Sequence, residues 1–142
     1  MKGLAVSVIA SLLSLVGARA EGLAEVTELA VGQKWSYAGG AETSHFVIGR
    51  IETVGGEEVV SISLFRPDAE PMVSDDGQTF PMTEFGHLPF SSDVIRRDAK
   101  RLLEEDAELS DMFESGYEQW RDAVREGGAG WFDAPIVQVA GR

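Results

Sequence analysis

Two histidines, His45 and His87, are the side chains of this sequence best suited to acid–base chemistry near neutral pH. His87 stands in the segment Phe-Gly-His-Leu-Pro-Phe at residues 85–90. With a nearby carboxylate it could serve as the base of a small hydrolase or isomerase. The simpler interpretation is packing, with His87 buried against backbone and His45 at a strand end on the rim of the core. Neither histidine has a partner at the spacing of H-x-x-x-H, so no metal site is predicted.

Other catalytic motifs are missing from the sequence. There is no G-x-S-x-G elbow, no phosphate-binding glycine loop and no cysteine. Asp75, Asp76 and Gly77 only faintly resemble a calcium loop, because the D-x-[DN]-x-[DN]-G frame and the distal glutamate are missing. We therefore predict no cofactor and favour a protein that is not an enzyme.

Large aromatic side chains are the remaining candidates for ligand contact. Trp35, Tyr37, Trp120 and Trp131, together with His87, could line a binding cavity. Aromatic residues at strand or helix spacing more often fill a core, so packing is the favoured interpretation of all five.

The clearest predicted element is a β-hairpin with strands at 43–54 and 57–65. Gly55 and Gly56 suit the positive φ angles of a two-residue turn, and this turn sets the register. His45 then lies opposite Arg66, at the far end. The register predicts one apolar face and one mixed face: the apolar pairs are Ile51–Val60, Gly49–Ile62 and Val47–Leu64, and the mixed pairs are Arg50–Ser61, Glu52–Val59 and Phe46–Phe65.

Weaker patterns predict the other elements. Alternation of apolar and polar residues predicts a strand at 31–37. Residues 66–78 should form an irregular loop, and residues 79–90 a short strand. A helix should begin at 91–93 and carry Ile95, Ala99, Leu102 and Leu103 on one face. A second helix should begin at the capping box formed by Ser115 and Glu118 and end at Gly127. Residues 134–140 should form a last strand.

Together these elements predict an α+β fold. We expect one domain at 21–142, built from an antiparallel sheet of about four or five strands with two helices packed on one face. Its strand order is left open.

The N-terminus has the pattern of a cleavable signal peptide. Lys2 precedes an uncharged apolar run at 4–16, and Ala18 and Ala20 occupy the −3 and −1 positions of the cleavage site. Cleavage after Ala18 is the alternative. The run is too short for a membrane anchor, so no transmembrane segment is expected in the mature chain. We expect a periplasmic or secreted protein.

The charge balance is strongly acidic. The chain has 12 basic and 24 acidic residues. Loss of residues 1–20 removes Lys2 and Arg19, which leaves 10 basic against 24 acidic residues, a formal charge of −14. Such a surface repels nucleic acid. It either keeps the protein in solution or attracts a partner, which could be a basic protein or a small ligand.

Three short motifs carry a family resemblance. They are Gly32-x-x-Trp35-x-Tyr37, the His87-Leu88-Pro89-Phe90 segment, and Gly116-Tyr117-x-x-Trp120 before a glycine-rich turn. On these motifs the chain resembles a group of uncharacterised small exported bacterial proteins. The resemblance implies an envelope protein, and it supplies no activity, substrate or site.

Three functional classes follow from these observations. The favoured one is a non-enzymatic periplasmic binding or protein-interaction module, with an inhibitor or immunity-type protein as a special case. A small periplasmic hydrolase or isomerase using His87 is the first alternative. A structural component of the cell envelope, recognisable by self-assembly, is the second. The oligomeric state is left open.

Overall fold

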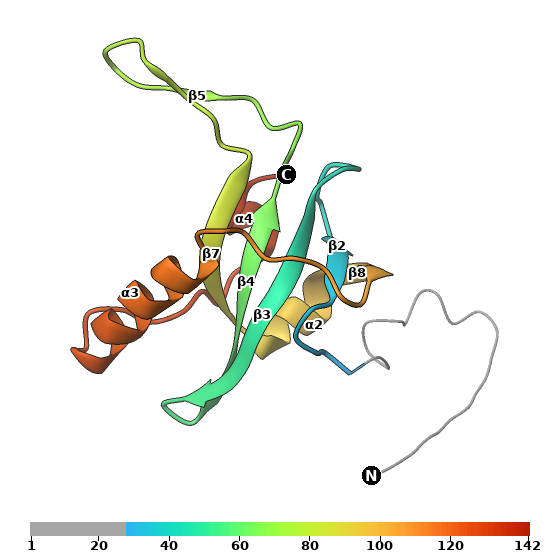
Figure 1. Ribbon diagram of the computed structural model, residues 1–142, viewed down its shortest axis with the longest axis vertical. Coiled ribbons are helices and arrows are strands. Elements are labelled where there is room, and N and C mark those ends of the chain that lie inside the picture. Colours follow the sequence, from blue (N-terminus) through green and yellow to red (C-terminus); the bar gives the residue numbers. More distant parts are fainter. Residues whose placement is uncertain (1–27) are drawn as a thin grey trace, which may run out of the picture.

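The structure, a computed structural model, describes residues 28–142 (Figure 1). The predicted signal peptide, with Ala18 and Ala20 at its cleavage site, lies outside these residues. Within residues 28–142, no helix has the length and apolar character needed to cross a membrane.

One antiparallel sheet of five strands organises the fold, in the order β7-β4-β3-β2-β8 (Figure 1). Its strands are β2 (Lys34–Tyr37), β3 (His45–Val54), β4 (Glu57–Phe65), β7 (Glu84–Ser91) and β8 (Ala99–Glu104). Two short strands, β5 (Met72–Val73) and β6 (Thr79–Phe80), pair with each other in a separate hairpin. The helices are α2 (Ser92–Asp98), α3 (Phe113–Arg125) and α4 (Ile136–Ala140). The predicted α+β class, with a five-stranded antiparallel sheet, is confirmed.

The β3–β4 hairpin follows the predicted register only near its turn. Gly55 and Gly56 both have positive φ, and Val54 pairs with Glu57. A bulge at Gly49 then shifts the pairing by one residue, which gives the pairs Ile48–Ile62, Val47–Ser63, Phe46–Leu64 and His45–Phe65. The predicted pairs Gly49–Ile62, Val47–Leu64, Phe46–Phe65 and His45–Arg66 are therefore wrong.

The bulge falls at a closely packed glycine. A Cβ atom added at Gly49 would overlap the ring of Phe113 on α3, so only glycine leaves room for that ring. Because a bulge reverses the alternation of side chains, Phe46 and Ile48 join Ile62 and the other core residues of β4.

Helices cover both faces of the sheet. Val94 and Ile95 of α2 and Ile136 of α4 pack into the main core, which also includes Trp35, Phe46, Ile48, Val60, Ile62, Leu64 and Phe90. The opposite face of β4 presents Val59, Ser61 and Ser63, all fully buried, toward α3. Two helices thus share one face, as predicted, but they are α2 and α4. The second helix predicted from the sequence, α3, lies on the other face.

The predicted first helix is too long. α2 ends at Asp98, and residues 99–104 turn into β8, which pairs with β2. Leu102 lies opposite Trp35 and Ala99 opposite Tyr37. This long-range pairing covers one edge of β2 and overrides the helical spacing of 95–103.

The C-terminal prediction of a strand at 134–140 is also wrong. Pro135 precedes the short helix α4, whose Ile136 N–H donates to the buried carboxylate of Asp98 at 2.8 Å. Since Asp98 closes α2, this bond joins the ends of two helices on the same face.

The start of α3 differs from the predicted capping box. The helix begins at Phe113 with Met112 at the cap and no side-chain cap bond, so the prediction from Ser115 and Glu118 is wrong. Its end is as predicted, since Gly127 has a φ of 80° and follows Glu126, the C-cap residue of the helix.

Candidate functional site

His87 is held between the sheet and α3. Its Nε2 lies 2.9 Å from the Ser61 hydroxyl, and its ring centroid lies 5.5, 5.7 and 5.3 Å from those of Phe113, Tyr117 and Trp120. Burial lowers the pKa of His87 to about 4, so the imidazole is neutral at pH 7.

A serine hydroxyl bonded to an imidazole also occurs in nucleophilic enzymes. Here Ser61 is 0% exposed, so a substrate carbonyl cannot reach its oxygen without displacing α3. No carboxylate among residues 28–142 bonds to Nδ1 of His87 to orient the ring. The geometry therefore makes Ser61–His87 a partly buried hydrogen bond beneath α3.

The low pKa of His87 predicts a specific pH dependence of stability. Between pH 6.5 and about 4 the unfolded chain binds a proton at His87 that the folded chain does not. The stability linked to His87 is thus full above pH 6.5 and is lost as the pH falls toward 4. Urea unfolding at pH 7 and pH 5 should show a smaller drop for His87→Gln than for the wild type. An NMR titration of His87 with a midpoint near 6.5 would contradict this.

Trp35 and Tyr37 lie in the main core. Trp35 is fully buried and its Nε1 donates to Gln33 Oε1 at 3.1 Å. The Tyr37 hydroxyl donates to the Gly141 carbonyl at 3.1 Å, and burial raises the pKa of Tyr37. Both side chains are buried in the main core, so they contribute to packing.

Trp120 and Trp131 are only half-buried. Trp120 Nε1 donates to the Gly130 carbonyl at 2.6 Å, which ties α3 to the following loop. Trp131 Nε1 donates to Glu57 Oε1 at 2.9 Å. Of the aromatic candidates, Trp131 therefore lies beside a cluster of surface carboxylates at the start of β4.

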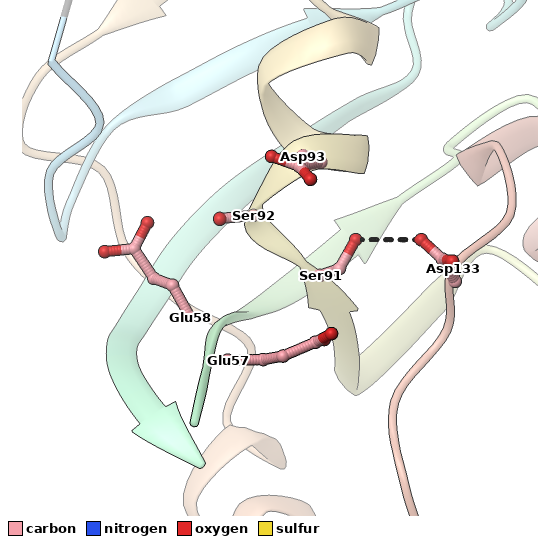
Figure 2. A pocket seen from close by; sticks show the side chains of 6 residues that line it. All are labelled: Glu57, Glu58, Ser91, Ser92, Asp93 and Asp133. Carbon is pink, nitrogen blue, oxygen red and sulfur yellow. Dashed lines mark hydrogen bonds between the residues drawn. The ribbon is translucent and has the colours of Figure 1, made fainter. Parts of the chain in front are cut away.

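That cluster lines a pocket of about 300 Å³ (Figure 2). We call it the acidic pocket, and its lining residues are Glu57, Glu58, Ser91, Ser92, Asp93 and Asp133. Ser91 Oγ donates to Asp133 Oδ1 at 3.2 Å across one side (Figure 2). The sequence could not reveal this pocket because its walls come from three separate segments.

The opposite end of the sheet carries a projecting hairpin. Residues 67–83, here called the arm, contain β5 and β6 and extend beyond the ends of β4 and β7 (Figure 1). Met72, Val73 and Phe80 are 53%, 64% and 45% exposed, and Met72 pairs with Phe80 across the two strands. The prediction of an irregular loop at 66–78 missed this hairpin.

The turn of the arm is built by its own polar side chains. The Ser74 hydroxyl donates to Asp76, and the Gln78 N–H donates to Ser74 Oγ at 3.1 Å. Asp75 and Asp76 therefore belong to a β-turn. Among residues 28–142, no group of three or more histidine, cysteine or carboxylate side chains is arranged to hold a metal ion.

No family model, no curated protein and no solved structure matches the chain.

Proposed function

We propose that this protein is an exported, non-enzymatic interaction module that binds a basic partner protein through the arm. The observation that carries the proposal is the exposure of Met72, Val73 and Phe80 on a hairpin that projects from the sheet. Met72 and Phe80 are paired and share one face of the hairpin, and Val73 is exposed on the other. Exposed apolar groups that lie together mark contact sites, since isolated ones are ordinary but contiguous ones are costly.

The charge of the arm specifies the chemistry of the partner. Residues 67–83 hold four carboxylates, Asp68, Glu70, Asp75 and Asp76, and no lysine or arginine. The exposed apolar residues of the two strands, with carboxylates at the turn and at the base of the arm, complement an apolar groove with a rim of lysine or arginine. A second copy of this chain is disfavoured as the occupant, because each copy carries a formal charge of −12 even before any cleavage.

Two further observations support the proposal. The apolar run at 4–16, followed by Ala18 and Ala20, supports export to the periplasm or the exterior. The burial of Ser61 under α3 favours binding over hydrolysis by His87, because the hydroxyl has no access to a substrate.

Binding of a basic partner is tested by passing an envelope extract over the immobilised protein and measuring which proteins it retains. The wild type should retain a basic protein at low ionic strength and release it when salt is raised. The variant Met72→Ser/Val73→Ser/Phe80→Ser should retain at least tenfold less, with an unchanged midpoint of thermal unfolding.

A matched control removes an exposed apolar residue elsewhere. Val31 is 58% exposed and lies outside the arm, so Val31→Ser should bind like the wild type. Equal retention by the triple variant, or retention that ignores ionic strength, would contradict the proposal.

A further inference from the structure

The arm is joined to the rest of residues 28–142 at its base. Its hydrogen bonds to other segments of this range are made by Asp68, Ala69 and Thr83. The Thr83 carbonyl accepts from the Arg66 N–H at 2.7 Å, and the Ala69 N–H donates to the Arg66 carbonyl at 2.9 Å. Farther out, β5 and β6 pair with each other and with no other strand of the described chain. Because a two-stranded hairpin is marginally stable by itself, the direction of the arm depends on what holds its base.

Arg66, the residue before the arm, contacts the C-terminal segment through its side chain. The guanidinium donates a hydrogen bond to the carbonyl of Ala140, the last residue of α4. It also lies over the ring of Phe85 on β7, 5.8 Å from the ring centroid. Figure 1 shows the C-terminus beside the point where the chain leaves β4 for the arm. Arg66 therefore connects the base of the arm to α4 and to the adjacent strand.

The segment that accepts this bond is itself held in place. The Tyr37 hydroxyl, at the end of β2, donates to the Gly141 carbonyl at 3.1 Å. Arg142 Nε donates to the Gly39 carbonyl at 3.0 Å. Because both bonds fix the chain next to Ala140, the Arg66 guanidinium is bound to an acceptor with a defined position on the sheet.

Glycine at position 141 makes the close approach of Arg66 possible. Gly141 has a φ of 89°, and a Cβ atom there would lie 2.8 Å from Nη1 of Arg66. Any larger residue at 141 would displace the guanidinium from the Ala140 carbonyl. The contact thus depends on a residue on each side of it.

The charge of Arg66 contributes little to the stability of the fold. Arg66 forms no ion pair within residues 28–142, and its Nε is buried there without a hydrogen-bond partner. The desolvation of a partly buried cation is hardly offset by a bond to a neutral carbonyl. An uncharged side chain of similar length would fill the same space. What the guanidinium adds is a directed bond between the base of the arm and α4.

We propose that Arg66 is a positioning residue, which fixes the direction of the arm by tying its base to α4. The arm then meets a partner in its binding orientation, so less conformational entropy is lost on association. This consequence for binding rests on the proposed function of the arm, whereas the fixed direction is a property of the free protein.

Electron paramagnetic resonance tests the direction of the arm in the full protein without a partner. The chain has no cysteine, so Gln78→Cys on the arm and Gln119→Cys on α3 place two spin labels at defined positions. The distribution of distances between the labels should be narrow with Arg66 present and about twice as broad in Arg66→Met. The midpoint of thermal unfolding should change by less than about 5 °C, because methionine keeps most of the packing.

Two further variants identify the cause of the broadening. Gly141→Ala should broaden the distribution as Arg66→Met does, since it displaces the same guanidinium without removing it. Arg101→Met, at an exposed position on β8 with no ion pair within residues 28–142, should leave the distribution narrow. A narrow distribution in Arg66→Met, or a broad one with Arg66 present, would overturn the proposal.

Retention of a basic protein from envelope extract separates this inference from the proposed function. Arg66→Met should retain about threefold less than the wild type, because a loosened arm loses more entropy on binding. Undiminished retention by a variant with a broad distribution would overturn the positioning role. If the wild type retains no basic protein, the proposed function is contradicted, and the distance distributions still decide whether Arg66 fixes the arm.

Discussion

Replacing Phe113 with alanine is expected to lower the free energy of unfolding by about 3–5 kcal/mol. Phe113 is 1% exposed, and its ring occupies the space left free by Gly49 on β3. The same ring packs against His87 and lies 6.1 Å from the ring of Tyr117. Truncation therefore leaves a cavity between α3 and the sheet that neither side can fill.

Urea denaturation measures this loss, and two observations test its cause. Met112→Ala, at the adjacent and 58% exposed position, should change stability by less than about 1 kcal/mol. In Phe113→Ala the pKa of His87 should rise from about 4 toward its ordinary value of 6.5, because water gains access to the imidazole. A small loss of stability with an unchanged histidine titration would show that α3 does not pack as described.

Trp35→Ala should have a similarly large effect, about 3–5 kcal/mol, on the other face of the sheet. Trp35 is fully buried in β2, where it pairs with Phe46 on β3 and Leu102 on β8. Its loss would open a cavity in the main core and loosen the attachment of β8. Thermal or urea unfolding provides the measurement.

A conservative variant distinguishes packing from ligand contact at Trp35. Trp35→Phe keeps most of the buried surface and loses the bond to Gln33, so its cost should be near 1 kcal/mol. If Trp35→Ala instead unfolded at the wild-type midpoint and lost partner binding, Trp35 would be a binding residue and its assignment to the core would be wrong.

Local chemistry made part of the fold predictable. The Gly55–Gly56 turn sets its own register, since positive φ angles and a two-residue loop suffice to define the pairs next to it. The bulge at Gly49 was not predictable in the same way, because the ring that packs against this glycine belongs to Phe113 on a distant helix. Without the bulge, the sequence pattern assigned Val47 to the wrong face.

The segment at 91–105 shows a second limit. Ile95, Ala99 and Leu102 recur at helical spacing, yet β8 begins at Ala99 because β2 offers an open edge there. Long-range pairing of this kind leaves no local trace. Similarly, Ser61 and Ser63 made one face of β4 look exposed, although α3 and the chain before it bury both residues.

The candidate sites depend on tertiary placement still more strongly. The side chains of Trp35, Tyr37 and His87 are suited to ligand contact, but the fold buries or covers them. The acidic pocket joins segments around 57, 92 and 133, which no motif connects. For the arm, the three prolines at 67, 71 and 81 were the one sequence feature that indicated a departure of the chain from the sheet.

Site-specific photo-crosslinking tests the proposed function of the arm most directly. A benzophenone amino acid is placed at Phe80 on the arm or, as a control, at Gln119 on the exposed face of α3, and the protein is irradiated in envelope extract at low ionic strength. The proposal predicts an adduct with one basic protein from position 80, suppressed by salt and missing from position 119. No adduct at position 80, or the same adduct from both positions, would contradict it.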